Sequence, residues 1–391
     1  MEGDEGRYYM YAQNLLRGYY SPANEVYLWN GPGYPLLLVP LLFFKLPLIW
    51  FTLLNAVFQY ISVVLLYKTL ILYVKSSRAL FFSCFWACYY IAFKEMGLIY
   101  TESFTVFLIA AFQYCFVMTF RTQCKKRHIL LAGSLLGYII LTKVIFAYVV
   151  LALLFLSLLS ILMLRRIIYR KSWMILGIAL LVNLPYLLYT YHISGKLFYW
   201  ANSGGSSLYW ASSPFKGEYG DWNNDDFTTY CNIDPLFPCN APLIAKNHEG
   251  DFKIFKQYKG VARDSLMKVK AIQNIKNNPL KYVKNYIANM GRMLFGLPQS
   301  FFYQRFQNLI RMPLNSIIFF FILFSSVFTI FRFRRIKKEI LGMLLFTFIY
   351  LAGSAALSAD QRQFYIIVPV ILLWTAFIID DLFFRLDSNH K

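Results

Sequence analysis

Apolar runs separated by short polar stretches recur along most of the chain. A helix needs roughly 20 predominantly apolar residues to cross the hydrocarbon core of a bilayer, and many of the runs approach or exceed that length. The pattern predicts an all-α polytopic membrane protein with about nine transmembrane helices. The predicted spans cover residues 48–74, 79–93, 97–119, 129–142, 144–164, 173–193, 314–331, 340–358 and 364–380.

Two further helices are predicted before the first span. The first begins near Asp4, whose carboxylate suits an N-cap, carries apolar residues at helical spacing, and stops at Gly18. The second lies in residues 35–46, an apolar stretch that is short for a crossing and is interrupted by Pro40. We expect this stretch to form a re-entrant or juxtamembrane helix.

Composition and charge agree with a membrane protein. Hydrophobic residues make up 58% of the 391 residues, and the mean hydropathy is +0.48. The net charge is +20, but the basic residues gather in short clusters between spans, which is typical of membrane topology and not of nucleic-acid binding. Each strong cluster follows an odd-numbered span, so the positive-inside rule places all of them in the cytoplasm. They are Lys75 and Arg78; Arg121, Lys125, Lys126 and Arg127; Arg165, Arg166, Arg170 and Lys171; and Arg332, Arg334, Arg335, Lys337 and Lys338.

The opposite, extracytoplasmic side receives polar residues that topology does not require. They are Asp4, Glu5, Lys94, Glu95, Glu102, Lys143, the long segment 194–313 and Asp360-Gln361-Arg362. The chain is therefore expected to consist of an N-terminal transmembrane module with its first outer loop (residues 1–193), an extracytoplasmic loop domain (194–313) and C-terminal transmembrane helices (314–391). Within the loop domain, the basic stretch 260–296 is expected to contact anionic lipid headgroups.

The positions of the cysteines and the absence of common motifs limit the chemistry that the chain can support. Cys231 and Cys239 are both in the outer segment and are expected to form one disulfide if that compartment is oxidising. No Cys/His cluster of metal-site spacing accompanies them. The sequence also lacks Walker A, His-Glu-x-x-His and Gly-x-Ser-x-Gly motifs, so it does not support ATP-driven, zinc-peptidase or serine-hydrolase chemistry.

A series of motifs runs in order along nearly the whole chain. They are Asp4-Glu5-Gly6-Arg7-Tyr8 with Ala12 and Leu15-Leu16; Gly31-Pro32-Gly33-Tyr34-Pro35-Leu36; Tyr100-Thr101-Glu102-Ser103; the glycine-rich run from Ala132 to Lys143; the outer-loop run from Gly204 to Gly217; and Gln361-Arg362-Gln363-Phe364 with Pro369. In their order and in their shared position on the outer side, these motifs resemble those of the GT-C membrane glycosyltransferases. The most similar group is glycosyltransferase family 39 and its relatives, the protein mannosyltransferase and aminoarabinose transferase-like family.

The chain departs from that family in two places. Members begin with a cytoplasmic N-terminus and one span before the acidic motif; that span is missing here, so we expect the true start to lie upstream. Relatives that bind a divalent metal often carry a Glu just before the proline-rich segment, where this chain has Asn30 and Gly31. A divalent metal ion is therefore left open as a cofactor and is not carried over.

The resemblance implies an integral-membrane glycosyltransferase with its active site on the extracytoplasmic side of a bacterial inner or plasma membrane. It implies transfer of a sugar from a polyprenyl-phosphate donor to a lipid, surface glycan or protein acceptor, by a single displacement with inversion. The residue roles it implies are Asp4 as general base; Glu5 and Glu102 as groups that orient the acceptor or hold a cation; Lys143, Arg362 and Arg7 as ligands of the donor phosphate; and Tyr34, Tyr209 and Trp210 as contacts of the sugar or acceptor.

Two alternatives stay open at this point. One is a non-catalytic flippase or transporter of lipid-linked sugars, and the other is an envelope-polysaccharide assembly subunit that has kept the fold without the activity. A transporter is expected to place charges near the middle of the bilayer. In this sequence, the extracytoplasmic charges lie instead at the outer ends of the predicted spans.

Overall fold

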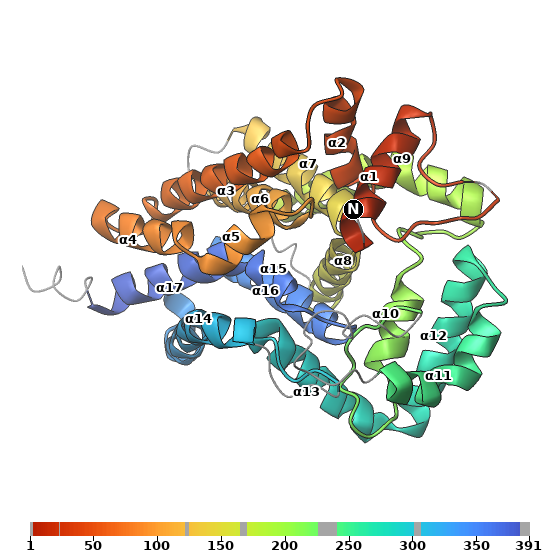
Figure 1. The fold of residues 1–391 in the computed structure, drawn as a ribbon. Helices are drawn as coiled ribbons and strands as arrows, with labels where there is room; N and C mark the ends of the chain where they lie inside the picture. The colour runs from red at the N-terminus through yellow and green to blue at the C-terminus, as the bar shows by residue number, and fades with distance from the viewer. Residues whose placement is uncertain are drawn as a thin grey trace, which may run out of the picture.

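The computed structural model describes residues 3–22, 24–121, 125–164, 170–225, 241–300 and 306–383. Within them the chain forms seventeen α-helices and one 3-10 helix, arranged as in Figure 1. The first half contains α1 (Gly3–Leu16), α2 (Gly33–Phe43), α3 (Ile49–Leu70), α4 (Ser76–Ala87), α5 (Tyr90–Met96), α6 (Glu102–Thr119), α7 (Lys126–Thr142), α8 (Ile145–Leu164) and α9 (Arg170–Ser194). The second half contains α10 (Gly204–Ala211), α11 (Ala241–Phe255), α12 (Gly260–Asn277), α13 (Pro279–Phe295), α14 (Phe306–Phe331), the 3-10 helix Phe333–Arg335, α15 (Lys338–Ala355), α16 (Gln361–Tyr365) and α17 (Val368–Phe383).

Six helices among the described residues are long and apolar enough to cross a membrane, namely α3, α6, α8, α9, α14 and α15. They identify the chain as a multi-pass integral membrane protein. By length and composition, six of the nine predicted spans are confirmed among the described residues, and the other three stay a prediction. The span predicted at 79–93 is divided between α4 and α5, the one at 129–142 lies on the 17-residue α7, and the one at 364–380 is shared by α16 and the 16-residue α17. The apolar run continues through the break between α4 and α5, so hydropathy does not reveal it.

The two helices before the first span form close to where they were predicted. α1 ends at Leu16, and Gly18 follows with a φ of 89°, the left-handed conformation of a glycine helix stop. Asp4 lies inside the first turn, and its carboxylate pairs with arginines, so the expected N-cap role is wrong. The 11-residue α2 is about 16 Å long, about half of the hydrocarbon thickness, and thus has the length of a juxtamembrane helix.

The ends of the long helices are tied together at the basic end of the bundle. Ion pairs and hydrogen bonds join helices whose neighbouring loops carry the basic clusters. They are Arg78 with Asp380 (2.7 Å), Arg332 with Asp381 (3.5 Å), Arg121 Nη2 with the Leu72 carbonyl (2.6 Å), Lys171 Nζ with the Thr119 carbonyl (2.8 Å) and the Tyr73 hydroxyl with Glu339 (2.8 Å). In Figure 1, α4 and the last turns of α17 lie at this end, whereas α1 and α10 to α12 lie at the opposite end.

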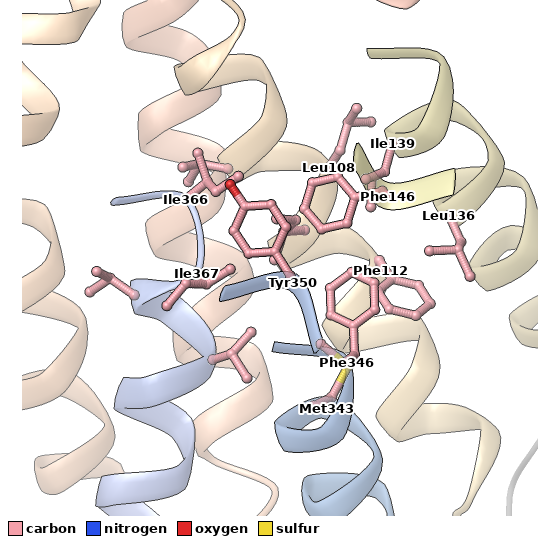
Figure 2. Close-up of a cluster of buried hydrophobic side chains, with 14 of the residues drawn as sticks. Leu108, Phe112, Leu136, Ile139, Phe146, Met343, Phe346, Tyr350, Ile366 and Ile367 are labelled. Atoms are coloured by element: carbon pink, nitrogen blue, oxygen red, sulfur yellow. The ribbon is translucent and has the colours of Figure 1, made fainter. Parts of the chain in front are cut away.

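The bundle core is aromatic and closely packed (Figure 2). The ring of Phe146 on α8 stacks on Tyr350 and Phe346 of α15, with ring centroids 4.5 Å and 5.3 Å apart. α7 and α9 approach closely because Gly133 and Gly137 leave room for the side chains of α9; a Cβ at either glycine would lie 2.6 Å from Ile178 or Val182. This packing positions the end of α7, which Lys143 follows.

The outer segment has a smaller hydrophobic core of its own. Tyr209 and Trp210 of α10 pack there against α11 and α12. Beside this core lies the buried pair of Glu218 and His248, whose Oε2 and Nε2 atoms are 2.8 Å apart. Burial by itself raises the pKa of Glu218, but hydrogen bonding and the charge of His248 outweigh burial and hold that pKa below its ordinary value. Cys231 and Cys239 lie outside the described residues, and the division at residues 193 and 313 stays a prediction.

Candidate active site

The end of α7 and the loop before α2 meet in direct contact. A Cβ at Gly31 would lie 2.1 Å from the Leu141 carbonyl oxygen, and one at Gly33 would lie 2.5 Å from Thr142 Oγ1. Real Cβ atoms do not approach so closely, so only glycine fits at either position. Lys143 follows as the C-cap of α7 and is placed beside this contact.

Lys143 makes a short ion pair with Glu102, the first residue of α6. Its Nζ lies 2.8 Å from Glu102 Oε1, and Glu102 is only 2% exposed. A buried carboxylate is tolerated when cations and hydrogen bonds compensate for lost hydration. Arg362 on α16 adds a second cation, with its Nε 4.0 Å from the same oxygen.

Arg362 also connects this pair to the amino-terminal helix. Its Nη1 lies 2.6 Å from Asp4 Oδ2, and Asp4 pairs in turn with Arg7 one turn further along α1. The result is one continuous chain of ion pairs, which we call the charge cluster: Arg7, Asp4, Arg362, Glu102 and Lys143. Three cations against two carboxylates leave one net positive charge.

Four members of the charge cluster, Asp4, Glu102, Lys143 and Arg362, line a cavity of about 220 Å³, which we call the polar cavity. Hydroxyl and amide groups complete its lining. Its polar residues are Asp4, Tyr8, Asn30, Glu102, Thr142, Lys143, Ser203, Ser207, Ser354, Ser358, Arg362 and Gln363, and Trp29 and Tyr350 add rings. Among the described residues, the buried Oδ1 atom of Asn30 has no hydrogen-bond partner. The cavity therefore offers hydrogen-bonding groups of both kinds around two cations and two carboxylates.

Several lining residues were not found from the sequence. Ser203, Ser207 and Ser358 come from the outer segment and the α15–α16 connection, and the Ser358 hydroxyl donates to the Ser207 carbonyl at 3.1 Å. No motif or periodic spacing marks these serines in the sequence. Trp29 lies in the α1–α2 loop, close to the proline-rich motif, and that position was the one available hint.

Five residues predicted for the site do not line the polar cavity. Arg7, expected to bind the donor phosphate, pairs with Asp4 from outside this cavity. Glu5 accepts the backbone N–H of Ile99 at 2.8 Å and does not line the polar cavity, so it anchors the loop before α6. Tyr34, Tyr209 and Trp210 are 1%, 0% and 2% exposed and pack inside hydrophobic cores. A sugar cannot stack on these rings in this structure, so the expected sugar-contact role is corrected: their aromatic character serves packing.

The described residues do not form a metal centre of the usual kind. Among them, no three His, Cys, Asp or Glu side chains come together in a way that would hold an ion. In the polar cavity, Asp4 and Glu102 are the two carboxylates, and each is already paired with a cation. A divalent ion would have to displace these arginine and lysine contacts before it could bind the two carboxylates.

A second, apolar cavity of about 350 Å³ lies nearer the basic end, and we call it the apolar groove. It is lined by α6, α7, α8, α9 and the first half of α15. Phe346 lines this groove, and Tyr350, one turn along α15, lines the polar cavity. Phe146 stacks on both rings (Figure 2), so packed aromatic rings of the α8–α15 seam lie between the two cavities.

The comparisons with known proteins are limited to distant structural likeness. No protein-family model matches the sequence, and no curated protein matches it. Among solved structures, the chain is similar to ArnT from Cupriavidus metallidurans bound to undecaprenyl phosphate, with 13% identity and a TM-score of 0.38 over 97% of this chain and 73% of that one. The apo form of the same protein gives the same identity and TM-score, over 96% and 73%.

Proposed function

We propose that the chain is a membrane glycosyltransferase that transfers a sugar from a polyprenyl-phosphate donor to an extracytoplasmic acceptor. One observation carries the proposal. Asp4, Glu102, Lys143 and Arg362 lie far apart in the sequence and at the ends of different helices, yet they form a single ion-pair chain on one cavity. That cavity lies away from the basic end, and the positive-inside rule supports an outer position for it.

Lys143 and Arg362 are the proposed ligands of the donor phosphate. Charge-assisted hydrogen bonds to phosphate are strong, and the guanidinium group can bind two oxygens at once. The net positive charge of the cluster favours an incoming anion. A bound phosphate competes with Asp4 and Glu102 for these cations, so donor binding loosens the carboxylates. The same cations stabilise the negative charge that builds on the phosphate as it leaves.

Asp4 is the proposed general base. In the resting structure, it is held by Arg362 and Arg7, and two guanidinium groups reduce the basicity of a carboxylate. When the phosphate takes Arg362, Asp4 retains one of these partners and becomes a better proton acceptor. The acceptor oxygen then forms a bond to the sugar C1 as the C1–O bond to phosphate breaks. The hydroxyl proton passes to Asp4, the polyprenyl phosphate leaves with the electron pair, and C1 inverts.

The prenyl chain is proposed to follow the α8–α15 seam into the apolar groove. None of residues 32–46 lines the apolar groove. The seam lies between the groove and the cavity that holds Lys143 and Arg362, so its packed rings must move apart for one headgroup and its chain to occupy both.

The test is transfer from a radiolabelled polyprenyl-phosphate sugar in membranes that contain the full chain. Asp4→Asn keeps the size of the side chain and removes the base, so transfer should fall by about 10²–10⁴-fold. Binding of unlabelled polyprenyl phosphate, followed by native mass spectrometry, should remain. Glu249→Gln on α11, exposed and outside the cavities, serves as a matched acid-to-amide comparison.

Equal label on the acceptor in wild type and Asp4→Asn would remove Asp4 as the base. Movement of label across the membrane without any transfer would favour the flippase alternative. The charge cluster argues against that alternative, because its members lie at helix ends and not along the middle of a span: Glu102 begins α6 and Lys143 follows α7.

A further inference from the structure

A larger cavity of about 490 Å³ adjoins the polar cavity, and we call it the aromatic cavity. Its walls come from the α1–α2 loop, α10, the segment after α10, and the start of α12. Four aromatic side chains line it: Tyr27, Trp29, Trp222 and Tyr258. Trp29 lines both cavities, so they share one wall. This volume falls within the range of roughly 300–1,000 Å³ that is usual for small-ligand sites.

The aromatic side chains are held in place and are not fully covered. The ring of Trp29 stacks on Tyr27 and meets Trp222 edge-on, with centroids 6.4 Å apart in both cases. The Arg7 guanidinium carbon lies 5.2 Å from the centroid of Trp29. Tyr258 is 44% exposed, and the other three rings are partly exposed. This contrasts with Tyr34, Tyr209 and Trp210, which lie in hydrophobic cores.

The charged groups of the aromatic cavity are already balanced. Three acids and three bases line it, and Lys259 pairs with Glu25 at 3.1 Å and Arg263 with Asp225 at 2.7 Å. Asp264 instead accepts the Gly205 N–H at 2.6 Å and the Tyr199 hydroxyl at 3.2 Å, and burial raises the pKa of its carboxyl. Arg7 is paired with Asp4. With three acids against three bases, the aromatic cavity offers no excess of cations to an anion.

We propose that the aromatic cavity is the acceptor subsite and that the acceptor it binds is an uncharged saccharide. This rests on the transferase function proposed above. A pyranose ring has faces of C–H groups that pack on aromatic rings, and a rim of hydroxyls that both donate and accept hydrogen bonds. The carboxylates and guanidinium groups of the paired residues present acceptors and donors to those hydroxyls.

The two cavities give acceptor and donor a shared boundary. Asp4 lines the polar cavity and Arg7 lines the aromatic cavity, and the two form an ion pair within one turn of α1. A saccharide packed on Trp29 and Trp222 would present a hydroxyl past the edge of Trp29 towards Asp4. The chemistry remains the displacement described above, with a sugar hydroxyl as the nucleophile.

The test measures saccharide binding separately from transfer. The purified full chain in lipid nanodiscs is probed by saturation-transfer-difference NMR with methyl glycosides and disaccharides of glucose, galactose and mannose, and with their 6-phosphates. Neutral saccharides should bind the wild type, and Trp222→Ala and Tyr258→Ala should each bind them about tenfold more weakly. Trp222→Phe retains a ring and should retain most of the affinity. Trp50→Ala, which removes a half-exposed tryptophan at the start of α3, is the matched control and should bind as the wild type does.

Three results would overturn the inference: no neutral saccharide binds, the phosphorylated sugars bind more tightly than their neutral parents, or Trp222→Ala and Tyr258→Ala bind as well as the wild type. Polyprenyl phosphate binding is measured in the same nanodiscs by native mass spectrometry. If it persists in these cases, the donor side of the transferase proposal stands and only the acceptor assignment fails. If the wild type binds saccharide but no polyprenyl phosphate, the transferase proposal fails, and the acceptor role fails with it.

Discussion

At the scale of single residues, Glu102 and Lys143 illustrate how this site holds charge inside a membrane protein. Glu102 is almost fully buried, and an ionised carboxylate in that position needs compensation for the water it has lost. Lys143 supplies most of this compensation at 2.8 Å, and Arg362 adds a more distant cation. Such a pair adds little net stability compared with two apolar residues, but the loss of one partner is costly. The pair is therefore better explained by a role in the site than by a contribution to stability.

Replacing Lys143 with methionine should destabilise the protein by roughly 3 kcal/mol, because Glu102 loses its closest cation. Adding Glu102→Gln to that variant should restore most of the stability, without restoring sugar transfer. Thermal unfolding in one detergent measures the first effect, and the radiolabel assay measures the second. Lys253→Met, which breaks the exposed Lys253–Glu249 pair, should leave the unfolding temperature unchanged. A double variant no more stable than Lys143→Met would contradict this account.

At the scale of elements, the contact between the α1–α2 loop and the end of α7 positions the site. Gly31 and Gly33 press against Leu141 and Thr142, and the Tyr138 hydroxyl donates to the Gly33 carbonyl at 2.9 Å. Lys143 comes immediately after this contact. Since the same loop carries Trp29 and Asn30 into the polar cavity, the glycines connect two walls of the site.

Gly33→Ala should lower stability by about 1–3 kcal/mol, because the new methyl group meets Thr142 and the backbone of Leu141. It should also reduce transfer, since α7 must shift and carry Lys143 with it. Gly177→Ala on α9 is the control, because a Cβ there meets nothing within 4 Å. That control should be neutral or slightly stabilising, as expected for alanine in a helix. Equal unfolding temperatures for both variants would show that the contact is looser than the structure indicates.

At the scale of the whole molecule, the bundle has two chemically different ends: one carries the basic clusters and the other carries the charge cluster. The basic end is joined by Arg78, Arg121 and Arg332, which reach from one helix to the end of another. The other end carries the four elements that supply the charge cluster: α1, the start of α6, the end of α7 and α16. Because basic residues are retained in the cytoplasm, this arrangement predicts the sidedness of the protein.

Cysteines introduced at the two ends should therefore react with a membrane-impermeant maleimide from opposite faces. Lys253→Cys on α11 should react in intact cells, and Arg335→Cys in the 3-10 helix should react only after the membrane is opened. The mass shift of each variant is compared with that of the wild type, whose own cysteines set the background. Reaction of both variants from the same face would contradict the topology and the outward orientation of the polar cavity.

The amino-acid order alone determined the properties that depend on local composition. Long apolar runs identify a membrane protein, and basic clusters mark one side of it, because the bilayer acts on each segment separately. The motif resemblance also selected Asp4, Glu102, Lys143 and Arg362, the four residues that the structure brings together; their catalytic roles remain a proposal.

Only the tertiary structure decided which residues are accessible and which share a cavity. The aromatic residues Tyr34, Tyr209 and Trp210 look in the sequence like Trp29 and Trp222, yet the first three are buried by helices distant along the chain. The exposure of a ring depends on what packs against it from elsewhere, and hydropathy along the chain carries no record of that. The same reason explains why Glu5, next to Asp4, binds a backbone N–H while Asp4 faces the polar cavity.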